Sequence, residues 1–340
     1  MANMNISTPR FYPDIVNFLM SRGLGQDGNF DVITGSNLIG VQTGSEAELF
    51  DMRPLNKVDF NTSAATSDHV LVNIDTQSTS TKKSFVAILN HNMASADAKV
   101  LIKASNTESH VQAVNMGSAT SMVNPAQVVN ADAIGSSIVI PATDGSTIVR
   151  FDESALRYWG IQFEGNSSNT FSSTDLFVGC ILIGEYYDMP HAPDLNVTRM
   201  ISYNRLNDLQ ESHGGQRFSN LKSYGRTAES TSKSPFTTAS NGYDSQGGRL
   251  IYDMNFSFIN STDLMPDEYD IIADDDNFVD DVWNKTNGNH IPFIFSIDKS
   301  SEGDNAESEH IFGRFANNSL DMAQVAPNVF NVSLTVEEEF

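Results

Sequence analysis

The sequence predicts an all-β protein, mainly antiparallel, built from two β-sandwiches, and three observations lead to this fold class. Charged residues make up only 19% of the 340-residue chain, and polar turn-forming residues separate its apolar clusters. Short alternating or wholly apolar runs recur with turn signals between them, as in sandwiches. A chain of this length can bury two cores. We therefore expect an N-terminal arm over residues 1–45, a first sandwich over 46–190 and a second over 195–340.

The stretch LFVGCILIGEYYDMP, Leu176–Pro190, is expected to close the first sandwich. Its apolar part is far shorter than the about 20 residues of a membrane-spanning helix, and β-branched and aromatic side chains dominate it. We interpret it as one strand buried on both faces, which ends before Pro190 and Pro193. Cys180 lies in this run. It is the only cysteine of the chain, so an intramolecular disulfide cannot form, and we interpret its side chain as a small buried hydrophobe.

Residues 1–45 look like an arm that is either flexible or held by a neighbouring subunit. Pro13 to Met20 could form a short helix, because proline suits the first helical turn. The glycine-rich piece from Gly23 to Gly44 contains one strand-like run, Phe30 to Ile33. It shows no periodicity long enough to predict a core of its own.

The first sandwich is expected to contain a series of short strands without helices between them. Its strand-like runs are Val70–Ile74, Phe85–Leu89, Lys99–Lys103, Ser137–Ile140, Thr147–Phe151 and Tyr158–Phe163, followed by the Leu176 stretch. Strands at this spacing are typical of an antiparallel sandwich.

Several of these segments carry a family resemblance. They are LFDMRP (Leu49–Pro54), HVLVNI (His69–Ile74), FVAILNHNM (Phe85–Met93), Val100–Ser105, RYWGIQF (Arg157–Phe163) and the Leu176 stretch. Together they resemble the galactose-binding-like (discoidin-type) jelly-roll domain in the version found in bacteriophage tail proteins, over about residues 46–190. The resemblance implies a jelly-roll fold. Many members of the wider superfamily bind glycans through loops at one end, and the residues around Asn90 to Met93 would be such a loop here.

The second sandwich is expected to include one packed helix near residues 266–286. Apolar residues from Ile271 to Trp283 recur at spacings compatible with one helical face. Asp274, Asp275 and Asp276 would cap that helix, and the acidic run DDDNFVDD would lie on its solvated face. A calcium site is the alternative, but the run lacks the ligand alternation, glycine and final glutamate of an EF-hand loop.

Three C-terminal segments also resemble phage tail proteins of the same group. They are PFIFSID (Pro292–Asp298), IFGRF (Ile311–Phe315) and NVFNVSLTVEEEF (Asn328–Phe340). This looser resemblance covers about residues 195–340. It implies a sandwich with one packed helix that assembles into ring-like homo-oligomers, contacts other tail proteins and resides in the virion after synthesis in the host cytoplasm.

The charge balance excludes some classes of partner. Lys and Arg number 20 against 43 Asp and Glu, which gives a formal charge of −23. Such a field repels phosphate backbones and anionic lipid, so we expect no direct nucleic-acid binding and no membrane insertion. The N-terminus lacks the pattern of a secretion signal. Nucleophile-elbow, zinc-helix, phosphate-loop and dinucleotide signatures are also missing, so we expect a non-enzyme without cofactor, catalytic or metal residues.

Three side chains could still bind a ligand. His91, in the sequence Asn90-His91-Asn92, could hold a metal or a sugar hydroxyl, but we interpret the group as a strand-end turn that bonds local backbone. Tyr158 and Trp159 could form a ligand platform, but we interpret both as core aromatics.

Two functions follow as hypotheses. The first is a non-enzymatic structural component of a phage tail, such as a tail-tip, distal-tail or adaptor ring, acting by subunit assembly. The second is a host-recognition module that binds surface glycan through the first sandwich. A freestanding lectin-like cellular protein is a third, disfavoured by the lack of a secretion signal.

Overall fold

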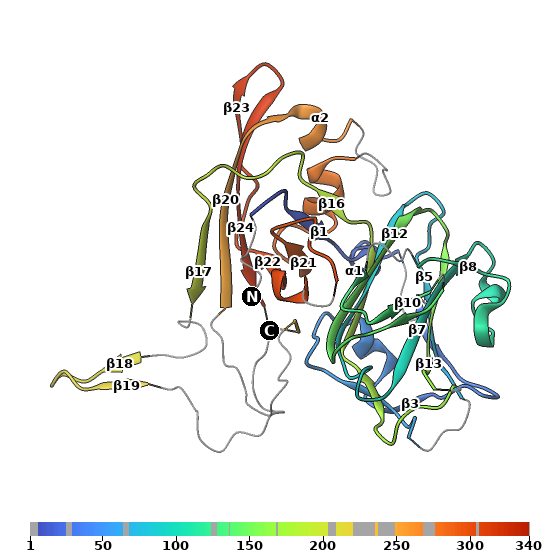
Figure 1. The fold of residues 1–340 in the computed structure, drawn as a ribbon. Helices are drawn as coiled ribbons and strands as arrows, with labels where there is room; N and C mark the ends of the chain where they lie inside the picture. Colours follow the sequence, from blue (N-terminus) through green and yellow to red (C-terminus); the bar gives the residue numbers. More distant parts are fainter. Residues whose placement is uncertain are drawn as a thin grey trace.

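The chain is all-β and mainly antiparallel, as the sequence predicts (Figure 1). The computed structural model describes residues 6–24, 29–63, 68–123, 128–135, 137–167, 169–202, 209–219, 235–236, 249–267, 276–303 and 306–339. No helix within these residues is long and apolar enough to cross a membrane.

The first sandwich has two main layers of antiparallel strands. The larger sheet runs in the order β10–β11–β7–β13–β5–β2, with β8 also paired to β7. Its strands are β2 (Phe30–Ile33), β5 (Val70–Asp75), β7 (Ala98–Ser105), β8 (Thr120–Ser121), β10 (Ala133–Ile134), β11 (Val139–Ile140) and β13 (Tyr158–Gly165). The facing sheet runs β15–β6–β12–β9, with β6 (Lys83–His91), β9 (Val128–Val129), β12 (Gly145–Ser154) and β15 (Cys180–Gly184).

One continuous core lies between these two layers. Val72 and Ile161 contribute from the larger sheet, and Ile88 and Ile181 from the smaller one, and none of the four is exposed to solvent. These residues occupy alternate positions of their strands, as one buried face requires. The alternation seen in the sequence therefore predicts this core correctly.

The Leu176 stretch forms two strands rather than one. β14 (Leu176–Val178) joins a small sheet with β4 (Val58–Phe60) and β3 (Val41–Thr43), whereas β15 belongs to the main layer. The chain changes sheet at Gly179, where a Cβ atom would lie only 2.1 Å from the backbone oxygen of Pro54. Only glycine tolerates so close a backbone approach. The prediction of burial is confirmed, because Cys180 and Ile181 are fully enclosed.

The described residues of the N-terminal segment, 6–24 and 29–45, pack against the rest of the chain and do not form a separate arm. The predicted short helix is present as α1 (Ile15–Ser21), capped by the Asp14 carboxylate, which accepts a hydrogen bond from the backbone N–H of Asn17 at 2.7 Å. Its apolar face, including Phe18 and Leu19, lies in the core of the first sandwich. β2 pairs with β5, and the short helix η1 (Glu46–Phe50) follows. The segment is held by its own chain because burying these side chains stabilises the fold.

The second part of the chain is built on one eight-stranded sheet. Its order is β16–β1–β21–β22–β24–β20–β17, with β23 also paired to β24. The strands are β1 (Arg10–Tyr12), β16 (Tyr187–Asp188), β17 (Thr198–Ser202), β20 (Arg249–Asn260), β21 (Phe293–Ser296), β22 (His310–Phe315), β23 (Met322–Ala326) and β24 (Val329–Glu338). In Figure 1 the blue strand β1 lies among the orange and red strands of this sheet. The division into units at residues 190–195 stays a prediction, since β1 and β16 precede it.

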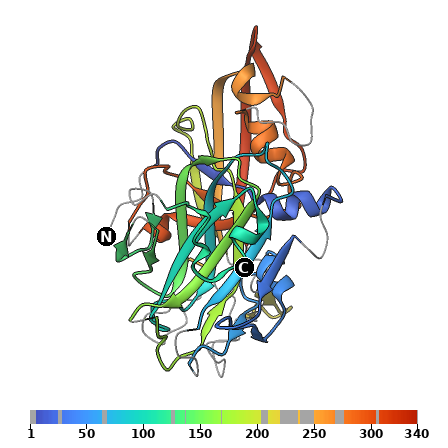
Figure 2. The same ribbon diagram turned by 90° about the vertical axis from the view of Figure 1, so that its right-hand side faces the viewer.

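The two faces of this sheet have different neighbours. Phe11, Phe293 and Phe315 lie on one face in a core of their own. Tyr12 and Ile294 lie on the other face and share a cluster with Phe85 and Leu89 of β6 from the first sandwich. The end formed by β20, β23 and β24 projects beyond the first sandwich (Figure 2).

The predicted helix near residues 266–286 is much shorter in the described residues. These contain α2 (Ser261–Leu264) and η6 (Val279–Asn284), a π-helical turn. Asp274 and Asp275 lie outside the described residues. Asp280 and Asp281 are buried, so the expectation that this run forms a solvated face is wrong for them. The reason is that Lys285 is also buried there, and its Nζ lies 2.8 Å from Oδ1 of Asp281.

Four further elements complete the description. They are the short helices η2 (Glu108–His110), η3 (Val114–Met116) and η7 (Ala306–Glu309), and the hairpin of β18 (Leu209–Glu211) with β19 (Arg217–Ser219).

Candidate functional site

His91 is a structural residue in the first sandwich. It is 1% exposed, and its Nε2 lies 2.9 Å from Oγ1 of Thr147. Its Nδ1 accepts a hydrogen bond from the backbone N–H of Met93. Burial lowers the pKa of His91 to about 3, which keeps the ring neutral. The interpretation as a turn that bonds local backbone is therefore confirmed for this side chain.

The rest of that turn also has its hydrogen bonds satisfied. Asn92 donates to the backbone oxygen of Asp175 and accepts from the backbone N–H of Phe177, and Asn90 donates to the oxygen of Pro54. These partners are distant in sequence rather than local. The side chains of Asn90, His91 and Asn92 therefore all contribute hydrogen bonds to the fold.

Tyr158 and Trp159 have different environments. Trp159 is fully buried and stacks on Phe151 with ring centroids 5.3 Å apart, so its interpretation as core is confirmed. Tyr158 is half-buried on the opposite face of β13 and lines a groove. It does not belong to the main core, because successive side chains of a strand point to opposite faces, but it packs against the smaller apolar cluster of Leu71, Leu101, Val111 and Met116.

Cys180 is enclosed in the core of the first sandwich. Burial raises the pKa of the Cys180 thiol, so the group stays protonated and unreactive. No group of three or more His, Cys, Asp or Glu side chains in the described part of the chain could hold a metal ion.

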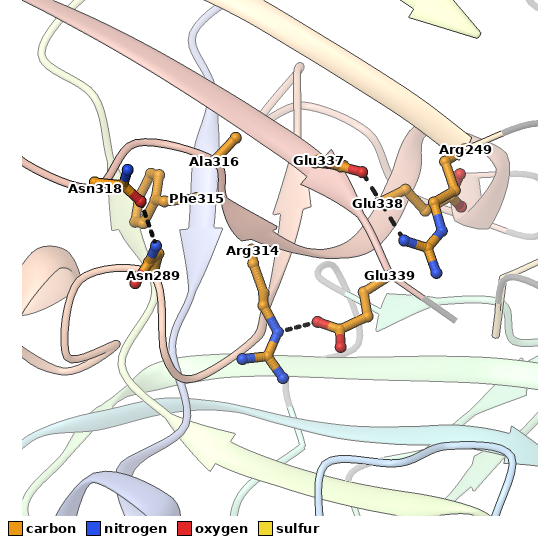
Figure 3. Close-up of a pocket in the computed structure, with 9 residues that line it drawn as sticks. All are labelled: Arg249, Asn289, Arg314, Phe315, Ala316, Asn318, Glu337, Glu338 and Glu339. Atoms are coloured by element: carbon orange, nitrogen blue, oxygen red, sulfur yellow. Dashed lines mark hydrogen bonds and ion pairs between the residues drawn. The ribbon is translucent and has the colours of Figure 1, made fainter. Parts of the chain in front are cut away.

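A groove at the end of β24 has a volume of about 330 Å³, and Figure 3 shows the charged residues in it. Arg314 pairs with Glu339 and donates to the backbone oxygen of His290. Glu337 pairs with Arg249 at 3.9 Å, and Glu338 accepts a hydrogen bond from the backbone N–H of Leu250. The charged side chains of this groove therefore pair with one another and hold the last strand in place, so no ligand is needed to account for them.

A second hollow, of about 290 Å³, lies between the two parts of the chain and is strongly acidic. Glu185 lines it and lies 3.6 Å from Nζ of Lys285, which also pairs with Asp281. Burial raises the pKa of Glu185 to about 7. The buried ammonium group of Lys285 thus lies close to two carboxylates, and the charged residues of this hollow hold the two parts of the chain together.

The third hollow, which we call the Asn73 groove, differs from the other two. It has a volume of about 250 Å³ and lies on the outer face of the larger sheet of the first sandwich. Asn73 on β5 is paired in register with Asp31 on β2 and with Gly160 on β13, and Tyr158 is paired with Asp75. Directly paired residues point to the same face, so these side chains share the groove's floor.

The segment that contains η2 and η3 covers this face and forms one wall. Gly160 allows the segment to lie close, because a Cβ atom there would fall 2.2 Å from the sulfur of Met116. Val111 and Met116 pack with Leu71 and Leu101 in a small apolar cluster. Tyr158 and Glu108 also line the groove.

Asn73 is the one asparagine lining this groove whose amide has no partner in the described residues. It is 8% exposed, and neither its Nδ2 nor its Oδ1 makes a hydrogen bond there. A buried amide without partners costs about 1–3 kcal/mol. A buried asparagine amide without a hydrogen bond in the fold points to a partner that is not part of the fold.

Comparisons with known proteins add only weak likeness. No protein-family model and no curated protein matches the chain. Among solved structures, it is similar to the chitosan-binding module 1 of a chitosanase/glucanase from Paenibacillus sp. IK-5, with 12% identity over 45% of this chain and 90% of the module, at a TM-score of 0.28.

Two modules from Clostridium perfringens are similar to the same extent. One is CBM32-1 of a family 31 glycoside hydrolase, with 10% identity over 46% of this chain and 95% of the module, at a TM-score of 0.29. The other is a further CBM32 module, with 16% identity over 46% of this chain and 94% of the module, at a TM-score of 0.22. At these values the likeness assigns no ligand, and the galactose-binding-like family stays a prediction.

Proposed function

We propose that the protein is a non-enzymatic binding protein whose first sandwich holds a sugar in the Asn73 groove. The observation that carries this proposal is the unpaired amide of Asn73. A sugar hydroxyl both donates and accepts, so two neighbouring hydroxyls can satisfy the Nδ2 and Oδ1 atoms together.

The lining of the groove is also suited to a sugar. Ile33, Val111 and Tyr158 supply apolar surface, and Asn73, whose amide atoms are buried, supplies a polar side chain in the wall. Small-molecule sites commonly combine an apolar lining with a few placed polar groups. Arg157 lies over the Tyr158 ring at 4.9 Å and holds Asp75 with two hydrogen bonds of 2.7 Å, which fixes this wall of the groove.

The test is glycan-array screening of the whole chain, followed by calorimetry with the best oligosaccharide. Asn73→Leu keeps the side chain's shape and removes its hydrogen bonds, so we expect it to weaken binding at least tenfold, a loss of about 1.4 kcal/mol. Asn289→Leu makes the same change in the C-terminal groove and should leave affinity unchanged. Binding that survives Asn73→Leu and fails in Asn289→Leu would place the site elsewhere.

A second function, subunit assembly, rests on the edge of the eight-stranded sheet. β17 is the last strand of that sheet, and Met200 and Ile201 on it are 39% and 60% exposed. Open edges that carry apolar side chains favour pairing with another chain. We propose that this edge contributes to the ring-like assembly and virion location that the resemblance to phage tail proteins implies.

Sedimentation of the whole chain tests this second proposal. Ile201→Lys should lower the measured mass of the oligomer, because it places a charge at the contact. Leu55→Lys, at a 42% exposed residue of the first sandwich, should not. A protein that stays monomeric at every concentration, alone and with other tail components, would contradict the proposal.

A further inference from the structure

The Asn73 groove is negatively charged. Four carboxylates line it, from Asp31, Glu46, Asp75 and Glu108. Asp75 is neutralised by Arg157, at 2.7 Å. Arg157 also interacts electrostatically with Glu108. Asp31 and Glu46 form no ion pair among the residues the structure describes, and no Lys, Arg or His of the described chain lines the groove. A ligand that fills it therefore gains from carrying positive charge.

The carboxylates are too dispersed to select a metal ion. Calcium needs six to eight oxygen ligands around one point, and no three acidic or histidine side chains of the described residues converge in that way. Glu46 is also held by the backbone N–H of Val32 at 3.1 Å, and Glu108 by Gln112 at 2.9 Å. The charge is thus spread along the walls, which suits an organic cation rather than a metal ion.

Asn73 decides which organic cation fits. An ammonium group only donates hydrogen bonds, so a lysine side chain would leave the Nδ2 donor of Asn73 unpaired. A hydroxyl beside the ammonium supplies the missing acceptor. A ligand that combines hydroxyl and amino groups in one compact unit meets both requirements.

Resting on the proposed function, we infer that the Asn73 groove selects a sugar with a free, positively charged amino group. Its hydroxyls pair with Asn73, and its ammonium lies between Asp31 and Glu108. The volume of about 250 Å³ is below the about 300–1,000 Å³ of sites for drug-sized ligands, so the groove takes one sugar ring.

Calorimetry of the whole chain with three β-linked oligomers of equal length tests the inference: glucosamine, N-acetylglucosamine and glucose. We expect the glucosamine oligomer to bind at least tenfold more tightly than the other two, and its advantage to shrink in high salt. Asp31→Asn combined with Glu108→Gln keeps the shapes and removes two charges. This double variant should lose roughly tenfold in affinity for glucosamine, so that the advantage of glucosamine over the two neutral sugars disappears.

The outcomes separate the inference from the proposed function. Equal affinity for all three oligomers, abolished by Asn73→Leu, overturns the amino-sugar selectivity and leaves sugar binding intact. No binding of any sugar on the array overturns both. The inference is also overturned if a lysine oligomer binds as tightly as the glucosamine oligomer and its affinity is the same for the native protein and for Asn73→Leu. The groove would then attract any cation.

Discussion

Asn73 and Asn92 are two almost fully buried asparagines of the first sandwich, 8% and 5% exposed, with opposite hydrogen-bonding states. Asn92 donates to Asp175 at 2.8 Å and accepts from Phe177 at 2.7 Å. Asn73 has no such partners in the described residues. The hydrogen bonds of Asn92 therefore stabilise the folded protein, whereas the buried amide of Asn73 destabilises it.

This contrast predicts opposite effects of one substitution. Asn73→Leu should raise the free energy of unfolding in the absence of ligand by about 1–3 kcal/mol, because it removes an unsatisfied buried amide. Asn92→Leu should lower it by a similar amount, because the partners of Asn92 lose their hydrogen bonds. Urea denaturation of both variants measures the difference. A loss of stability in Asn73→Leu would show that its amide is satisfied in the free protein.

The sequence alone identifies the face of Asn73 but not its environment. The alternation of Val70 to Ile74 predicts that Asn73 points away from the core, and the structure agrees. Its burial depends on η2 and η3, whose segment has no periodicity in the sequence. A groove of this kind joins residues from β2, β5, β13 and η2, and such long-range proximity leaves no local pattern.

At the scale of elements, the chain's early residues complete both parts of the fold. Phe11 on β1 packs against Phe295 at 5.1 Å and Phe278 at 5.6 Å between ring centroids. β1 itself lies between β16 and β21. Sequence patterns detect α1 and β2, but a three-residue strand is too short for a periodicity. Because strand β1 cannot be detected in this way, the sequence alone predicts a separate arm over residues 1–45.

Phe11→Ala should therefore destabilise the eight-stranded sheet, although most of its strands lie far along the chain. Removal of a fully buried Phe side chain costs about 3–5 kcal/mol. Ile6→Ala, at a 51% exposed residue of the same segment, should change the free energy of unfolding by less than about 0.5 kcal/mol. Denaturant titrations of the two variants provide the comparison, and equal stabilities would contradict the assignment of β1 to this core.

At the scale of the whole molecule, the contact between the two parts contains a buried group of charges. Glu185 follows β15, and Lys285 and Asp281 belong to the η6 region, so the ion pairs join residues from both parts. Burial raises the pKa of Glu185 from 4.5 to about 7, while Lys285 opposes that rise and Asp281 adds to it. Lys82 and Glu153 act more weakly on the same carboxylate.

The raised pKa of Glu185 predicts how stability depends on pH. Between pH 4.5 and 7 the folded protein retains a proton that the unfolded chain has released, so the contribution of Glu185 is largest below pH 4.5 and is lost as pH rises through 7. The change is on the order of 3 kcal/mol. Urea denaturation of the native protein and of Glu185→Gln from pH 4.5 to 8 isolates this contribution, since the variant lacks the titrating group. Parallel curves for the two proteins would disprove it.

The position of β1 also governs the order of events during synthesis. Residues 10–12 leave the ribosome long before their partner β21 (Phe293–Ser296), which follows more than 280 residues later. At about 5–20 residues per second, the apolar side chain of Phe11 waits roughly 15–60 s for that partner. The first sandwich can form during this interval and already holds α1, directly after β1. It thus keeps the waiting strand beside the place where the last strands of the nascent chain will arrive.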